Sequence, residues 1–182
     1  MFTTNLILGS LLLLVHCRSA VSRKVDCTER CCLFVENVPG KLKNLRVLFQ
    51  DIKGYYEDND DLESVLLDDG VFQNFKSRYG CHAVNDVLRF YRDTVLPAAM
   101  NDTLKNEQFK LSIDSIGQTF KTLMRDILAC RNYFSCVEPF DIKNIVKSYN
   151  GMESKGMFKA MGELDVLFNY IEEYLASKRR RH

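Results

Sequence analysis

Cysteine is the residue type in this chain that is best suited to covalent chemistry. Cys17 lies just after an amino-terminal apolar run, and the other six cysteines follow it. They are Cys27, Cys31, Cys32, Cys81, Cys130 and Cys136. An even number of cysteines in an exported chain predicts disulfides, and six can pair in many ways that spacing alone does not decide. We therefore expect structural bridges.

Two other uses of these thiols compete with that interpretation. Cys81 stands beside His82, as in a cysteine–histidine nucleophile, but a disulfide would occupy the thiol. A zinc site built from Cys27, Cys31, Cys32 and His82 is the second rival, and an oxidising compartment disfavours it.

The usual signatures of catalysis are missing from the sequence. It has no glycine-rich phosphate loop, nucleophile elbow or HExxH motif. Asp60, Asp61, Asp68 and Asp69 do not have the spacing of a calcium loop. We predict that the protein is not an enzyme and uses neither a metal nor a cofactor.

The apolar run at residues 6–15 is typical of a signal peptide. It is shorter than the ~20 residues that span a membrane. Small residues at Ala20 and Ser22 offer two cleavage sites. We expect residues 1–22 to be a signal peptide, residues 23–182 to form one secreted helical domain, and no part to insert in a membrane.

The charge balance gives no reason to expect nucleic acid as a partner. Arg18 would leave with the leader, which lowers the 25 basic residues to 24, the number of acidic residues. A nucleic-acid-binding domain would carry a basic excess.

Apolar residues recur with a helical period in the two longest stripes. The last segment places them at Met157, Met161, Leu164, Phe168, Ile171 and Leu175. An earlier one places them at Phe109, Ile113, Ile116, Phe120, Leu123 and Ile127. Spacings of four and three residues predict amphipathic helices with a buried stripe.

Prolines and polar caps suggest where helices begin and end. We expect Pro39 to open the first helix and Pro97 to end a third helix over 81–96. Asp141 and Ser154 are candidate caps for the fifth and last helices. The whole pattern predicts an all-α chain of six helices.

The connection before the last two helices is short. Only residues 130–140 are available, and they include Pro139. Such a tether would hinder the last two helices from folding back onto their own bundle, and two chains could then exchange them in a swapped dimer. The residues alone leave a monomeric bundle equally open.

Two sequence stretches resemble the signatures of the interleukin-10 family of class II helical cytokines. The first consists of KAM at 159–161, ELD at 163–165 and NYIE at 169–172. The second is KSRYGCHAVNDVLRFY at 76–91. With the cysteine spacings between them, the resemblance covers nearly all of the chain after the leader.

The resemblance also implies a disulfide pattern. It pairs Cys31 with Cys130 and Cys81 with Cys136, which leaves Cys27 and Cys32 to join each other. Cys31 and Cys32 are adjacent, so they could exchange roles. An extra pair of this kind resembles fish members of the family, which predicts a fish origin.

The resemblance further implies a fold, a partner and a function. The fold is a six-helix cytokine bundle in an intertwined, domain-swapped homodimer. The partners are class II cytokine receptor chains, which the dimer would cluster to trigger Janus kinase and STAT signalling with an anti-inflammatory outcome.

The resemblance places receptor-binding residues on two helices. The first helix and its following loop contribute Lys43, Arg46, Lys53, Glu57, Asp60 and Glu63. The last helix contributes Lys159, Glu163, Asp165 and Glu172. Arg46 and Asp165 should matter most, because truncating a desolvated charged contact costs ~2–5 kcal/mol. Lys43 stands where some members carry Arg, and Lys does not reproduce bidentate pairing. Idle surface charge is the alternative for each residue.

Three further interpretations remain open at this point. A secreted, disulfide-rich lipid-binding protein is the alternative function, and it would need a cavity among its helices. Asn101 heads the glycosylation sequon Asn101-Asp102-Thr103, in a connection after Pro97 that could equally be an unmodified turn. The basic residues 178–182 either form a solvated tail or bind sulfated glycans.

Overall fold

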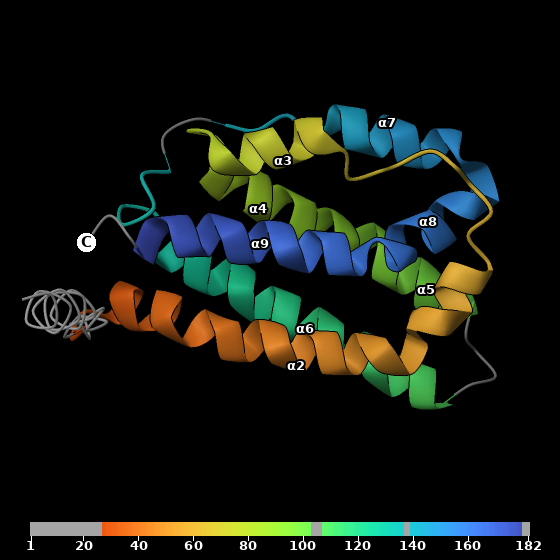
Figure 1. Ribbon diagram of the computed structural model, residues 1–182, viewed down its shortest axis with the longest axis horizontal. Helices are drawn as coiled ribbons and strands as arrows, with labels where there is room; N and C mark the ends of the chain where they lie inside the picture. The colour runs from red at the N-terminus through yellow and green to blue at the C-terminus, as the bar shows by residue number, and fades with distance from the viewer. Residues whose placement is uncertain (1–26, 103–106, 137–138, 180–182) are drawn as a thin grey trace, which may run out of the picture.

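The computed structural model describes residues 27–102, 107–136 and 139–179, and every regular element in those ranges is helical (Figure 1). The α-helices are α2 (Arg30–Asp58), α3 (Asp69–Lys76), α4 (Gly80–Phe90), α5 (Leu96–Asp102), α6 (Glu107–Ala129), α7 (Lys143–Gly151), α8 (Gly156–Gly162) and α9 (Leu164–Arg179). A π-helical turn (Tyr91–Val95) joins α4 to α5, and a 3₁₀ turn (Glu153–Lys155) precedes α8. The predicted leader and the last three residues of the basic tail lie outside the described ranges.

The two predicted apolar stripes form the centre of the bundle. α2 packs against α6 and α9, and α4 packs against α6. Phe120 of α6 and Phe168 of α9 are fully buried and meet edge to face at 6.3 Å. Phe49 of α2 contacts Phe168 in the same way. The period of the stripes therefore predicted the core correctly, since each aromatic lies on the expected face.

The first helix begins earlier than its sequence suggests. α2 starts at Arg30 and runs through Pro39, which was expected to open it. Pro39 is exposed, while Val35 and Val38 beside it are buried, and Phe34 packs edge to face on Phe134. A proline inside a helix costs ~3 kcal/mol. Burial of Phe34, Val35 and Val38 offsets the cost of Pro39 inside the helix, and this burial depends on tertiary contacts that the local sequence does not show.

Pro97 does not end the third helix, contrary to expectation. The chain widens into the π turn just before it, where the Leu96 amide donates to the Tyr91 carbonyl five residues back. Pro97 then occupies the first turn of α5, where its missing N–H costs little. As a result Asn101 lies at the end of a helix rather than in the connection that was predicted.

The last helix is divided at Glu163. α8 ends at Gly162 and α9 begins at Leu164, although a single helix over 157–175 was expected. Ser154 lies within the 3₁₀ turn and is not the cap of α8, a position that Lys155 occupies. Ile142 is the residue before α7, while Asp141 still accepts a hydrogen bond from the Lys143 amide.

The tether before α7 does not keep the last helices away from their own bundle. In Figure 1 α9 lies beside α2 of the same chain, and α8 and α9 both contact α2. Within one chain the short connection therefore allows this packing, and the exchange of these helices between two chains stays a prediction.

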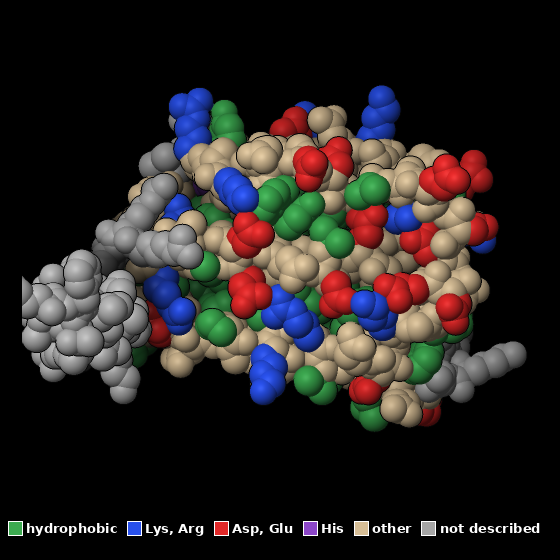
Figure 2. Space-filling view, in the orientation of Figure 1, with side chains coloured by type: hydrophobic (Ala, Val, Ile, Leu, Met, Phe, Trp, Pro, Cys, Tyr) green, Lys and Arg blue, Asp and Glu red, His purple; other side chains and the backbone are tan. Residues whose placement is uncertain are grey.

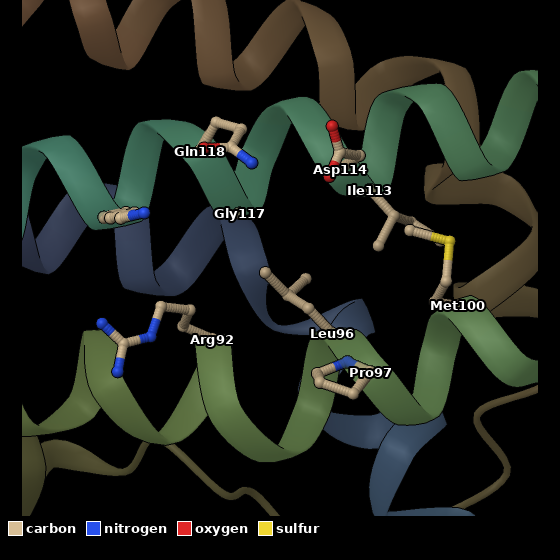
Figure 3. Close-up of a pocket in the computed structure, with 9 residues that line it drawn as sticks. Arg92, Leu96, Pro97, Met100, Ile113, Asp114, Gly117 and Gln118 are labelled. Atoms are coloured by element: carbon tan, nitrogen blue, oxygen red, sulfur yellow. The ribbon is translucent and has the colours of Figure 1, made fainter.

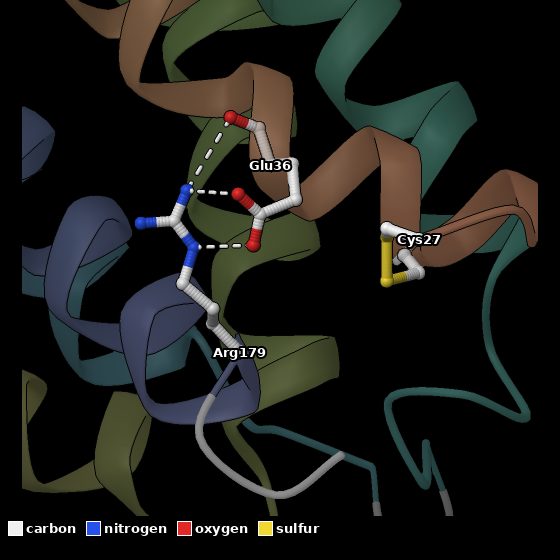
Figure 4. Close-up of a disulfide and its surroundings, with 4 residues drawn as sticks. Cys27, Glu36 and Arg179 are labelled. Carbon is white, nitrogen blue, oxygen red and sulfur yellow. Dashed lines mark hydrogen bonds and ion pairs between the residues drawn. A yellow bond between two sulfur atoms is a disulfide. The ribbon is translucent and has the colours of Figure 1, made fainter. Parts of the chain in front are cut away.

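The three disulfides join the pairs that the family resemblance implied. They are Cys27–Cys32, Cys31–Cys130 and Cys81–Cys136. Cys31–Cys130 links the start of α2 to the end of α6. At the same end of the bundle Arg179 of α9 forms a double ion pair with Glu36 of α2, at 2.7 and 2.8 Å (Figure 4). These links tie both ends of the described chain to α2.

No helix in the described part of the chain combines the length and apolarity needed to cross a lipid bilayer.

Candidate functional site

Charged side chains lie along the contact between α2 and α9. Lys53 of α2 places its Nζ 2.6 Å from Asp165 Oδ2 of α9, and 3.5 Å from Glu57 Oε1 one helical turn on. The hydrogen bond that Lys53 donates to the Asp165 carboxylate raises the pKa of Lys53 above its ordinary value, so Lys53 is positively charged at neutral pH. Both partners of the Lys53–Asp165 pair keep about a third of their side chains in solvent.

Arg46 forms a second link between the same helices. Its Nη2 lies 2.6 Å from Glu172 Oε2 and 2.9 Å from Asn169 Oδ1. Asn169 was not among the predicted site residues, although its place three residues before Glu172 puts it on the same helix face. We call Arg46, Lys53, Glu57, Asp165, Asn169 and Glu172 the α2–α9 seam.

The seam forms a continuous band on one face of the molecule. Figure 2 shows acidic and basic side chains alternating along the line where α2 meets α9. Lys43 and Glu63, two other predicted site residues, are exposed to solvent. The structure therefore brings five of the predicted residues together in the seam and leaves these two at the surface nearby.

Three predicted site residues lie inside the fold. Lys159 and Glu163 are 7% and 9% exposed, and Asp60 pairs with Lys159 at 2.7 Å. Glu163 accepts hydrogen bonds from the backbone amides of Leu66 and Leu67. The charged type of these residues suggested a surface role, but their partners are in the segment between α2 and α3. Burial of this kind depends on tertiary structure, so helical periodicity did not reveal it.

The chemistry available to the seam is binding rather than catalysis. Cys27, Cys31 and Cys32, the thiols of the rival zinc site, are all in disulfides, as is Cys81 beside His82. Among the described residues no three histidine, cysteine or acidic side chains cluster as metal ligands. Half-exposed, preoriented charges of both signs are what a partner of complementary charge would recognise.

A hollow between α5 and α6 bears on the lipid alternative. Its volume is about 310 Å³, and Leu96, Pro97 and Ile113 form part of its lining (Figure 3). Arg92 and Asp114 also line it, and Figure 3 shows both charged side chains beside the apolar ones. The hollow lies between two neighbouring helices rather than within the core that α2, α6 and α9 share. A lipid carrier needs an enclosed apolar cavity, so this feature does not favour that function.

The remaining predicted sites lie at the ends of elements. Asn101 is exposed at the end of α5. In the basic tail, Arg179 is engaged by Glu36, and Lys178 lies 5.1 Å from the centre of the Tyr174 ring. Arg179 therefore contacts α2 while remaining exposed, and Lys178 contacts a ring one turn earlier on its own helix.

Comparison with known proteins gives a consistent family. The model of the family described as Interleukin 10 matches residues 6–177. The chain is 38% identical to interleukin-10 of Gallus gallus over 174 residues, covering 94% of this chain and 95% of that protein. It is 32% identical to interleukin-10 of Felis catus, covering 82% and 83%, and 30% identical to that of Sus scrofa, covering 90% and 93%. These bird and mammalian relatives do not support the predicted fish origin.

Proposed function

Since this chain belongs to the interleukin-10 family of cytokines, and is accordingly not an enzyme, we propose that it is a secreted ligand that clusters class II cytokine receptor chains. Bringing receptors together would allow their Janus kinases to act on one another and activate STAT proteins, with an anti-inflammatory outcome. Family membership supports this function. The family match and the similarity to the bird and mammalian proteins also weigh against the lipid-carrier alternative.

The observation that carries the receptor assignment is the α2–α9 seam. Its cations and carboxylates are held by cross-helix pairs at 2.6 Å, yet they remain partly exposed. A receptor can therefore exchange or extend these pairs without the cost of ordering long side chains. In this proposal Arg46 and Asp165 are the central contacts, and Lys43, Lys53, Glu57, Glu63 and Glu172 surround them.

We also propose that two chains exchange helices α7, α8 and α9. Within one chain these helices already make the contacts with α2 that an exchange would reproduce between chains. A dimer would gain no new type of contact; it would present two copies of the seam on a two-fold axis. Each seam would then combine α2 of one chain with α9 of its partner, which joins dimerisation to receptor clustering.

Export of the chain follows from the same proposal. We assign residues 1–22 as a signal peptide and the rest as the mature domain. The three disulfides are consistent with secretion, because oxidising compartments allow such bonds to form and persist. Exposed Asn101 is the proposed glycan site, which a mobility change after glycosidase treatment would test.

A receptor-ectodomain binding assay tests the seam. Asp165→Lys and Arg46→Glu should each weaken binding to the receptor ectodomain by at least ~30-fold, the equivalent of about 2 kcal/mol. Asp126→Lys is the matched control, since Asp126 forms a comparable cross-helix pair with Lys41 between α2 and α6. Full binding by both seam variants would remove the seam from the receptor site.

Light scattering during size-exclusion chromatography tests the assembly. The mature chain should elute with twice the mass of one chain, and equal amounts of tagged and untagged protein should exchange partners only after unfolding. A monomer that still binds receptor with full affinity would contradict the exchange of helices.

A further inference from the structure

The segment between α2 and α3 has no helical structure of its own. Residues 60–68 run from the end of α2 past α8 to α3 (Figure 1). Such a segment must pair its backbone groups with something outside itself, since its own geometry offers no regular ladder. Two of its residues, Leu66 and Leu67, are nevertheless buried.

The side chains of α8 and the helix break supply the missing partners. Glu163 accepts hydrogen bonds from the Leu66 amide at 2.9 Å and the Leu67 amide at 2.7 Å. Lys159, one helical turn earlier, donates to the Leu62 carbonyl at 2.6 Å. We refer to Lys159 and Glu163 together as the loop clamp.

Two further contacts complete the attachment. Lys159 Nζ lies 2.7 Å from Asp60 Oδ2, whose side chain is only 15% exposed. Tyr170 of α9 donates its hydroxyl to the Leu67 carbonyl at 2.9 Å. The backbone of residues 62, 66 and 67 is therefore held by side chains about a hundred positions later in the chain.

We propose that the loop clamp consists of positioning residues, which shape segment 60–68 into part of the receptor surface without contacting the receptor themselves. The inference rests on the proposed function and changes the role of two residues that the family resemblance had placed in the contact surface. At 7% and 9% exposure, Lys159 and Glu163 present little side chain to a partner. The exposed members of the segment, including Asp61 and Glu63, are the groups that a receptor would meet.

The chemistry of the clamp suits positioning. A buried ion pair contributes little net stability, because desolvation offsets the attraction between its charges. A carboxylate that accepts two backbone amides instead specifies one backbone path, since any other path leaves those amides unpaired at ~1–3 kcal/mol each. If α8 and α9 are exchanged between chains, the clamp would shape the loop of one chain with side chains of the other.

Hydrogen exchange at the Leu66 and Leu67 amides tests the clamp without a receptor. Glu163→Ala should speed their exchange by roughly tenfold or more, and Glu163→Gln less, because its one oxygen retains an acceptor for one amide. Glu173→Ala is the control: Glu173 lies on α9 but is exposed and pairs with Lys76. It should leave both amides protected.

Receptor binding by the same proteins then separates positioning from contact. Glu163→Ala should weaken binding roughly tenfold together with the faster exchange, whereas Asp165→Asn should weaken binding and leave the two amides protected. Weaker binding with unchanged amide exchange would make Glu163 a contact residue and overturn the proposal. Faster exchange with full affinity would also overturn it, since the shape of the segment would then be irrelevant.

Three features keep this test decisive. If Glu163→Ala does not fold, Glu163→Gln and Lys159→Met supply the graded loss. Lys159→Met keeps most of the unbranched side chain and removes the ammonium group that bonds to Leu62 and Asp60. If the wild-type protein binds no receptor, the proposed function fails, while the exchange measurement still reports whether the clamp holds the segment.

Discussion

Lys53 Nζ and Asp165 Oδ2 lie 2.6 Å apart across the seam, between residues separated by 112 positions in the chain. The pair has a structural role and a proposed role in receptor binding, and reversing its charges distinguishes the two roles. Asp165→Lys should lower the free energy of unfolding by about 1 kcal/mol, because it faces two cations toward each other in a partly solvated position. Urea unfolding at a fixed protein concentration measures this loss.

The double variant Lys53→Asp with Asp165→Lys restores an opposite-charge pair. It should recover most of the lost stability, except for a few tenths of a kcal/mol from repulsion between the carboxylate introduced at position 53 and Glu57 one turn away. Receptor binding should stay weak, because the charge pattern toward solvent is inverted. If the double variant regained binding as well, the pair would act on the receptor only through stability.

Gly80 marks a close approach between the start of α4 and its neighbours. A Cβ atom there would lie 2.7 Å from Tyr174 Cε2 and closer still to the Phe75 carbonyl oxygen. Gly80→Ala should therefore cost about 2–3 kcal/mol of unfolding free energy, as overpacking in a core does. Thermal or urea unfolding of the purified variant measures the loss.

Gly54 provides the matched control for this substitution. It lies inside α2, and a Cβ there would meet nothing within 4 Å. Gly54→Ala should stabilise the protein by about 0.5–1 kcal/mol through reduced backbone freedom of the unfolded chain. A Gly80→Ala protein as stable as Gly54→Ala would show that the approach at Tyr174 is looser than the structure has it.

The disulfides should differ in what they contribute. Cys31–Cys130 spans 99 positions and Cys27–Cys32 spans 5. In the chain-entropy account a bridge stabilises more as the loop it closes lengthens, so replacing the first pair by serine should cost about 4–5 kcal/mol and the second about 2 kcal/mol. Urea unfolding of the two double variants tests the order; equal losses would mean that contacts around the bridges decide, rather than loop length.

Periodicity explains why most of the architecture was predictable. Helical structure is present in each predicted region, because burial of an apolar stripe requires the three- and four-residue spacing that α6 and α9 show, although a π turn interrupts the third predicted helix and the last is divided at Glu163. Pro39 and Pro97 misled the boundaries for a shared reason. Packing of Phe34 on Phe134 compensates for Pro39 inside α2, and the π turn at 91–95 accommodates Pro97. Neither feature can be recognised from the sequence around the proline.

The candidate site was predictable only in part. Charges on an amphipathic helix indicate its polar face, but only the family resemblance assigned Arg46, Lys53 and Asp165 to one receptor surface. The spacing does not say whether a charged residue faces solvent or a neighbouring backbone. For Glu163 the deciding partners are the amides of Leu66 and Leu67, and only the tertiary fold brings them to it.

Acidification should reveal the burial of Glu163 through stability. Burial raises the pKa of Glu163 above its ordinary value of 4.5, although the Leu66 and Leu67 amides and Lys159 oppose the shift. Between the unfolded and folded pKa values the folded state binds more protons. This site's contribution is therefore fully present below the unfolded pKa and is lost as pH rises through the folded one.

The sign is opposite for a paired surface carboxylate. The hydrogen bond from Arg92 lowers the pKa of Asp93, so that residue loses stabilisation as pH falls. Comparison with Glu163→Gln isolates the buried group, because glutamine does not titrate while Lys159, Asp60 and Tyr91 remain around it. From about pH 7 to about pH 5 the wild-type protein should gain unfolding free energy relative to this variant. Urea unfolding across that range measures the difference, and a relative loss for the wild type would mean that the amides and Lys159 outweigh burial and hold the folded pKa below 4.5.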